Sequence, residues 1–147
     1  MTVPVKIKKL REDAIIPTKG SEESAGYDIY AAIDNAHQIT PHHTGSIGTG
    51  LAIEVPNDYW IGLFARSGLA TKNGLRPANC VGVIDSDYRG EIIMPVHNDS
   101  EEAHVFWSGD RIGQLIILPK YDWEIEEVSE LEDTERQDGG FGSTGIN

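Results

Sequence analysis

The chain has 147 residues and a formal net charge of −12, from 12 Lys and Arg against 24 Asp and Glu. Its length and its 39% of hydrophobic residues favour one folded domain with a real core. The acidity excludes a surface for nucleic acid or for anionic lipid, since both need a basic face. The single cysteine, Cys80, excludes an intrachain disulfide and a cysteine-based zinc site.

The N-terminal segment and the apolar runs give no sign of export or membrane insertion. Residues 1–12 lack the apolar stretch of a secretory signal. The longest fully apolar run, Leu115–Leu118, is far shorter than the roughly 20 residues of a membrane span. We therefore expect a soluble intracellular protein, cytoplasmic or nuclear, with no membrane and no nucleic acid among its partners.

Short apolar runs between 16 glycines and 7 prolines predict an all-β domain. In chain order, the expected strands are Val3–Ile7, Leu51–Val55, Tyr59–Phe64, Glu91–Val96, Ala103–Trp107, Ile112–Leu118 and Trp123–Val128. No window sustains helical periodicity, so at most one short helix is expected, near Gly68–Asn73. Many short strands at close spacing predict a sandwich, barrel or jelly roll.

The C-terminal part differs in composition from the rest. Residues 121–138 hold nine acidic side chains and one basic side chain, and Gly139–Asn147 contains four glycines. Composition alone predicts an acidic, frayed tail.

Two segments in the first half could bind an anion or a metal. Asp28 lies in the apolar run Ala25–Ala32, where an acid must be satisfied, either functionally or by a turn or backbone N–H groups. Arg66, Ser67 and Gly68 precede the expected helix and suit a phosphate, because arginine supplies forked donors and glycine allows close approach. An N-cap serine beside a surface arginine explains the same residues equally well.

Two further segments follow. Residues 79–90 read as a strand, an Asp-x-Asp-Tyr turn and a second strand, which predicts a hairpin. Its two acids, Asp85 and Asp87, either only form the turn or place in it a general base that deprotonates water. Gln114 lies in an apolar strand, where its amide needs a partner.

The last segment, Arg136–Gly145, sets an aromatic ring among glycines before two hydroxyl residues, which suits a mobile flap over a flat phosphorylated ligand. Other templates fail, because the five histidines lack His-Glu-x-x-His spacing and no Gly-x-Ser-x-Gly elbow occurs.

These five segments, in this order and over about Ala25–Gly145, resemble the homotrimeric dUTPase (deoxyuridine triphosphate nucleotidohydrolase) family. The resemblance implies a jelly-roll-like β subunit, a homotrimer with an exchanged C-terminal arm, and active sites shared between subunits. It places the β domain, with the exchanged strand, at residues 1–135 and a Gly-rich flap at 136–147. The implied partners are the small-molecule substrate dUTP and further copies of the chain.

The implied reaction is hydrolysis of dUTP to dUMP and pyrophosphate with Mg²⁺, by in-line attack of a water on the α-phosphorus. This dUTP diphosphatase activity limits uracil in DNA and supplies dUMP for dTMP synthesis. By resemblance, Asp85 is the general base that activates the water, and Asp28 holds Mg²⁺ through water. The implied substrate-binding residues are Arg66, Ser67, Gly68, Asn79, Gly82, Val83, Tyr88, Gln114, Arg136, Phe141, Gly142, Ser143 and Thr144.

Three positions depart from the family pattern: Ala65 replaces a common Pro, Gly113 a common Ala, and Gln137 a usual Gly. Gln137 affects the hinge of the expected flap, and the other two changes look mild. Two alternatives remain: a dCTP deaminase-like enzyme of the same fold, and a dUTP-gated interaction module. The intact tail argues against the deaminase, and the acidic 121–138 segment is the feature that would serve a protein partner.

Overall fold

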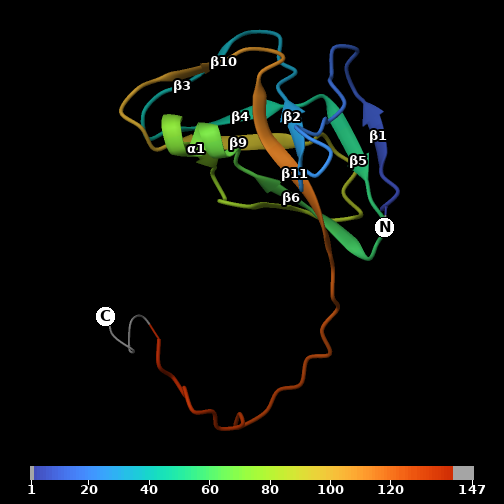
Figure 1. The fold of residues 1–147 in the computed structure, drawn as a ribbon, viewed down its shortest axis with the longest axis vertical. Helices are drawn as coiled ribbons and strands as arrows, with labels where there is room; N and C mark the ends of the chain where they lie inside the picture. Colours follow the sequence, from blue (N-terminus) through green and yellow to red (C-terminus); the bar gives the residue numbers. More distant parts are fainter. Residues whose placement is uncertain (1, 141–147) are drawn as a thin grey trace.

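The computed structural model describes residues 2–140, and within them short antiparallel strands dominate (Figure 1). The strands are β1 (Lys6–Lys9), β2 (Tyr27–Tyr30), β3 (His37–Ile39), β4 (Thr44–Gly48), β5 (Leu51–Glu54), β6 (Tyr59–Phe64), β7 (Leu75–Pro77), β8 (Gly82–Ile84), β9 (Ile93–Asn98), β10 (His104–Phe106) and β11 (Arg111–Pro119). In this described part of the chain the only helix is α1 (Ser67–Asn73). The expected all-β fold with one short helix is thus confirmed.

Two sheets enclose the main core. One has the strand order β2-β11-β6-β8 and the other β4-β9-β7, while β1 pairs with β5 and β10 with β3. Side chains from both large sheets, such as Ile29, Leu63 and Met94, join one buried cluster. Residues of β9 alternate between exposed or half-buried and fully buried positions, because successive side chains of a strand point to opposite faces.

The expected strands mostly appear, with shifted ends. β6 has the expected bounds, whereas β1 begins only at Lys6. Residues 79–90 do not form a hairpin ladder: β8 pairs with β6, and β9 pairs with β4 and β7. The prediction of a hairpin was therefore wrong, because the chain crosses from one sheet to the other at this turn.

The C-terminal segment leaves the β domain after β11. Within the described residues, the last backbone hydrogen bond to the domain runs from Lys120 N to Asp58 O, at 2.7 Å. Figure 1 shows the chain then extending away from the body. The strand expected at Trp123–Val128 is absent from this single chain, because a strand needs a partner and nothing in the described part of the chain pairs with it.

Candidate active site

Four of the polar side chains gather where β2, β11 and β6 run side by side. Gln114 on β11 lies opposite both Asp28 on β2 and Phe64 on β6. Asp28 Oδ1 accepts a hydrogen bond from Arg66 Nε at 3.1 Å, and Arg111 Nη1 lies 3.4 Å from Oδ2. We call Asp28, Arg66, Arg111 and Gln114 the Asp28 cluster.

The carboxylate of Asp28 is satisfied neither by a turn nor by backbone N–H groups, the two structural explanations considered from the sequence. Its side chain is 16% exposed, and two guanidinium groups satisfy its carboxylate, with no part for a turn or a backbone N–H group. Arg111 was not among the candidate site residues expected from the sequence, although a cation three residues before Gln114 could have indicated a place beside it. Two guanidinium groups against one carboxylate leave a local positive charge in an acidic chain, which suits an anionic ligand.

Gln114 has the partner that its position requires. Its Nε2 donates to the carbonyl oxygen of Ala65 at 3.0 Å, which leaves the second N–H of the amide for a ligand. Its Oε1 lies against Gly26, where an added Cβ would come within 2.5 Å of it. Gly113 is also required, since a Cβ there would lie 2.9 Å from Phe64 O. The change from Ala to Gly at 113 therefore matters for packing.

The segment Arg66–Gly68 begins α1 beside this cluster. Arg66 is the N-cap residue, with an extended backbone and no capping bond from its side chain, so the expected N-cap serine is instead the first helical residue. Ser67 is exposed, as is Gly68. A Cβ on Gly68 would meet nothing within 4 Å, so packing inside the chain does not demand a glycine there.

Asp85 and Tyr88 lie on a second feature, the acidic turn (residues 85–91). Tyr88 N donates to Asp85 O at 3.1 Å, and Tyr88 Oη donates to Glu91 O at 3.1 Å. Among residues 2–140, no hydrogen bond or ion pair engages the exposed carboxylate of Asp85. A hollow of about 200 Å³ lies along the turn, lined by Val83, Ile84, Asp85, Tyr88, Glu91, Ile92 and Ile93.

The walls of this hollow are partly apolar and open to solvent. Val83 is 64% exposed and Ile93 is 45% exposed, so both present apolar surface to the hollow. Asn79 is also exposed, and its Nδ2 lies 3.5 Å from the position that a Cβ of Gly82 would take. A hollow with partly apolar walls, a tyrosine ring and an amide nearby can hold a flat ring with a polar edge.

The Asp28 cluster and the acidic turn lie apart in a single chain. On the β6 ladder, Ile84 pairs with Ile61, which puts Asp85 level with Trp60, whereas Gln114 pairs with Phe64. Four strand residues separate those levels, about 13 Å along the strand. A base and a phosphate-binding amide cannot serve one reacting atom across that distance.

The candidate residues of the C-terminal segment are only partly described. Arg136 Nε donates to Gly139 O at 2.7 Å, within a local turn. Gln137 has a φ of +49°, in the left-handed region that favours glycine, which explains why a glycine suits this position. Phe141, Gly142, Ser143 and Thr144 lie outside the described residues.

Two further searches bear on the class of site. In residues 2–140, no group of three or more His, Cys, Asp or Glu side chains could hold a metal ion directly. Another hollow, of about 400 Å³ and lined by residues such as Lys72 and Glu102, contains none of the candidate residues. No helix of the described chain has the length and apolarity to cross a membrane.

An all-β fold with a positively charged cluster, an acid that has no partner within residues 2–140 and a partly apolar hollow is the combination expected of an enzyme that acts on a phosphorylated, ring-containing ligand. Comparison with known proteins identifies the family: the dUTPase family model matches residues 12–145. The deoxyuridine 5'-triphosphate nucleotidohydrolase of Nautilia profundicola is 48% identical over 141 residues, covering 96% of this chain and 98% of that protein. The same enzyme of Desulfitobacterium hafniense is 46% identical and covers 99% of this chain and 98% of its own.

A solved structure agrees with these relatives. The Staphylococcus bacteriophage 80alpha dUTPase with dUPNHPP is 29% identical, with a TM-score of 0.84, covering 97% of this chain and 99% of that one. The chain belongs to the dUTPase family. It is an enzyme of the dUTP diphosphatase class.

Proposed function

We propose that the chain hydrolyses dUTP to dUMP and pyrophosphate at active sites shared between the subunits of a homotrimer. The observation that carries the proposal is the division of the candidate residues into the Asp28 cluster and the acidic turn, about 13 Å apart along one chain. Two copies can bring together what one copy keeps apart, with the acidic turn of one subunit facing the Asp28 cluster of its neighbour.

Asp85 is the general base in this proposal. Its carboxylate is exposed and has no partner in the described chain, so it is free to accept a proton from water. That water attacks the α-phosphorus in line, the bond to the bridging oxygen breaks, and pyrophosphate leaves with the electron pair. A positioned base of this kind contributes about 10²–10⁴-fold to the rate.

The Asp28 cluster binds the phosphates. Within residues 2–140, the side chain of Arg66 donates only from Nε, to Asp28, so its other N–H groups remain for phosphate oxygens, as does the second N–H of Gln114. Exposed Ser67 and Gly68 lie next to this cluster and extend the contact surface, and Gly68 leaves open space for a close approach.

The donor set fits Mg²⁺ held mainly by the substrate. Asp28 is the one carboxylate of the cluster, and each of its oxygens has a single arginine partner, which leaves each one free to accept a bond from a water on the ion. Mg²⁺ commonly keeps several waters and binds through one or two carboxylates plus substrate phosphates. When bound, it would neutralise charge on the triphosphate.

Base selection is assigned to the hollow of the acidic turn. Asn79, Gly82 and Val83 form the edge that reads uracil, and the ring of Tyr88 packs on the deoxyribose where a 2′-hydroxyl would need room. A site built to hydrogen-bond one base edge rejects an analogue that leaves its polar groups unpaired. The phage 80alpha dUTPase, a relative with the same fold, binds dUPNHPP.

The C-terminal segment supplies the arm and the flap. Trp123 is 83% exposed and Ile125 is 82% exposed, two residues apart, so both point to the same side of an extended chain and can be buried on another subunit. We place the end of the exchanged arm at residue 135 and the flap at 136–147, where Arg136, Phe141, Gly142, Ser143 and Thr144 would close over the nucleotide. The enzyme then acts inside the cell, limiting uracil in DNA and supplying dUMP for dTMP synthesis.

The test is pyrophosphate release from dUTP, dCTP, dTTP and UTP, with Mg²⁺ and after chelation by EDTA. We expect release from dUTP alone, lost on chelation and restored by added Mg²⁺. Asp85→Asn should keep dUTP binding and lose at least about 100-fold in kcat. Full turnover by Asp85→Asn would remove Asp85 from the role of base, and ammonia release from dCTP would favour a deaminase.

A further inference from the structure

The turn that carries Asn79 is held in a strained conformation. Cys80 has a φ of +65°, a left-handed value that residues other than glycine rarely adopt. Val81 N donates to Asn79 O at 2.8 Å across it, and Cys80 N donates to Pro77 O at 2.9 Å. Such a backbone persists only where surrounding contacts stabilise it, and strained positions of this kind cluster at functional sites.

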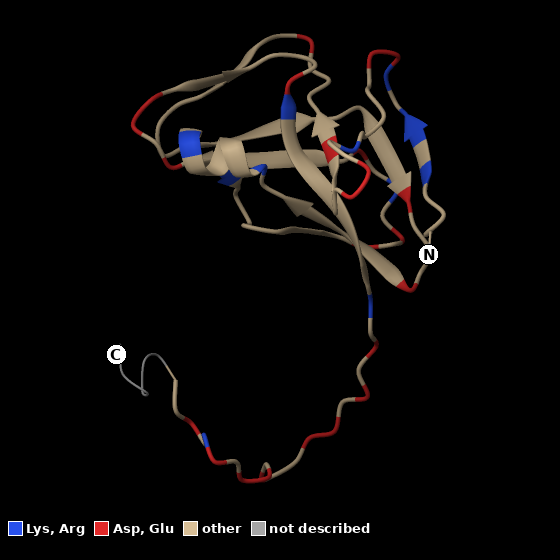
Figure 2. Ribbon diagram, viewed as in Figure 1, with Lys and Arg blue, Asp and Glu red and all other residues tan. Residues whose placement is uncertain are grey.

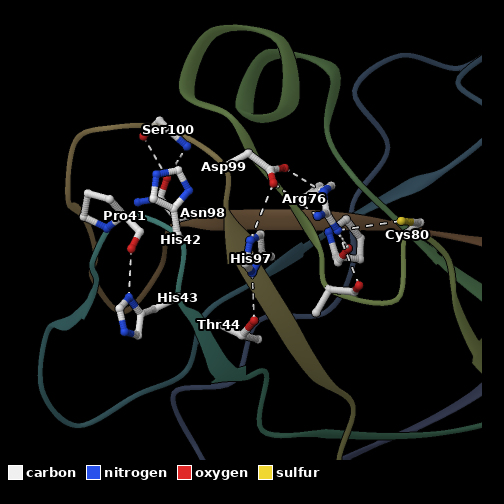
Figure 3. A network of polar contacts seen from close by, with 12 residues as sticks. Pro41, His42, His43, Thr44, Arg76, Cys80, His97, Asn98, Asp99 and Ser100 are labelled. Carbon is white, nitrogen blue, oxygen red and sulfur yellow. Dashed lines mark hydrogen bonds and ion pairs between the residues drawn. The ribbon is translucent and has the colours of Figure 1, made fainter.

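Arg76, on β7, provides contacts that stabilise this turn (Figure 3). Its Nη1 donates to the carbonyl oxygens of Pro77 and Ala78, at 3.3 and 3.4 Å, and lies 3.7 Å from Cys80 Sγ. One nitrogen of a single guanidinium group thus contacts the turn on both sides of Asn79.

Asp99 fixes Arg76 from the opposite side. Its two oxygens accept hydrogen bonds from Arg76 Nε at 2.6 Å and from Arg76 Nη2 at 3.2 Å, a two-point contact that sets the plane of the guanidinium. The backbone N–H of Asp99 donates to Gly74 O at 2.8 Å. His97 Nε2 lies 3.5 Å from Asp99 Oδ1, and His97 Nδ1 lies 2.9 Å from Thr44 Oγ1. The network therefore connects β4, β9 and β7 to the turn (Figure 3).

We propose that Arg76, oriented by Asp99, is a positioning residue that sets the place of Asn79 and thereby the choice of base. The inference rests on the role proposed above for Asn79. In the described chain no hydrogen bond holds the side chain of Asn79, so the backbone of the turn determines where its amide lies. A displacement of about 1 Å at such a group can cost about 100-fold in catalytic efficiency.

The experiment measures kcat and KM for pyrophosphate release from dUTP and from dCTP in purified full-length variants. The variants are Arg76→Met, Arg76→Lys, Asp99→Asn and Asn79→Ala. Arg11→Met is the matched control, because Arg11 also makes a two-point contact, at 2.9 Å twice with Asp13, and is 33% exposed against 35% for Arg76. Arg11 makes no contact with the turn.

Arg76→Met and Asn79→Ala should each raise the KM for dUTP by about tenfold or more and lower the dUTP-to-dCTP ratio of kcat/KM similarly, with a smaller change in kcat. Asp99→Asn should act in the same direction but less, because Arg76 keeps its bonds to the carbonyls. Arg11→Met should leave KM and the ratio as in the wild type. If Arg76→Met does not fold, Arg76→Lys, which keeps the charge but lacks the fork, replaces it.

A purely structural role for Arg76 predicts a different pattern, which would overturn the inference: a lower Tm and kcat with KM and the ratio unchanged. Loss of discrimination in Asn79→Ala but not in Arg76→Met would also overturn it, while leaving the role of Asn79 intact. Unchanged discrimination in Asn79→Ala would overturn both assignments. None of these outcomes depends on whether Asp85 is the base.

Discussion

Asp28 occupies a strand position where an acid is disfavoured, and two arginines from other parts of the chain compensate it. Arg66 comes from the N-terminus of α1 and Arg111 from the start of β11, so the partners are 38 and 83 residues away in sequence. The sequence alone predicted that Asp28 and Gln114 needed partners. It could not name them, since the pairing depends on the register of β2 and β11.

The Arg76–Asp99 pair should make the stability of the fold depend on pH. The pKa of Asp99 lies below its ordinary value, chiefly because Arg76 donates to the carboxylate; burial opposes this, and the charge of Arg76, then His97 and His42, add to the lowering. Because the pKa is lower in the folded state, ionised Asp99 stabilises the fold above about pH 4. That contribution is lost as the pH falls through the folded-state pKa.

Arg76→Met should therefore lower the Tm at pH 7, and the difference from the wild type should shrink as the pH falls below about 4. The effect at pH 7 should be small, because Asp99 is 46% exposed and water screens the pair. Thermal unfolding followed by circular dichroism across this range measures it. A Tm difference that keeps the same size from pH 7 down to the lowest pH at which the protein folds would show that Asp99 ionisation plays no part.

At the scale of elements, β11 lies at the centre of the site because it pairs with β2 on one side and β6 on the other. Gly113 permits this packing, with Phe64 O only 2.9 Å from where a Cβ would stand. Short apolar runs bounded by turns predicted β6 and β11 well. The same reasoning predicted a strand at β9 but gave the wrong pairing for residues 79–90, since a pattern of apolar residues indicates a strand but not which strand it pairs with.

Gly68 and Gly113 offer the same substitution in two different surroundings. Gly113→Ala should destabilise the fold by about 1–3 kcal/mol, because the new methyl group meets backbone and Met94.

Gly68→Ala places its methyl group in open space within a helix. The free energy of unfolding should therefore stay the same or rise by up to about 1 kcal/mol, and the Tm should not fall. If a phosphate approaches Gly68, kcat/KM should nevertheless fall at least about tenfold. Wild-type activity of Gly68→Ala would argue against a phosphate there.

The charge is unevenly distributed over the whole molecule. Residues 121–138 contribute eight of the twelve net negative charges, and Figure 2 shows the acids following the extended C-terminal segment. The charge of −12 therefore does not exclude a polyanionic substrate, because the Asp28 cluster is locally positive. The strand expected at Trp123–Val128 also depends on the whole assembly, since a second copy of the chain would have to provide the strand that pairs with it.

Deletion of residues 136–147 removes the flap and keeps the arm, so it distinguishes the roles of the two parts. We expect the truncated protein to remain a trimer, because the apolar residues of the arm precede the cut, and to lose most of its activity, because the flap no longer closes over the substrate. Analytical ultracentrifugation and pyrophosphate release measure the two properties. Wild-type activity after truncation would mean that the segment is only a tail, and a stable, active monomer would exclude shared sites.

Complementation between two inactive variants tests the sharing of sites most directly. Asp85→Asn lacks the base on the acidic turn, and Gln114→Ala lacks an amide of the Asp28 cluster, so each should be inactive alone. Unfolding and refolding an equal mixture produces mixed trimers in which about a quarter of the sites combine an intact turn with an intact cluster. We expect activity to return to about that fraction of the wild-type value. A mixture that stays as inactive as its components would contradict the account, because each site would then be built from a single chain.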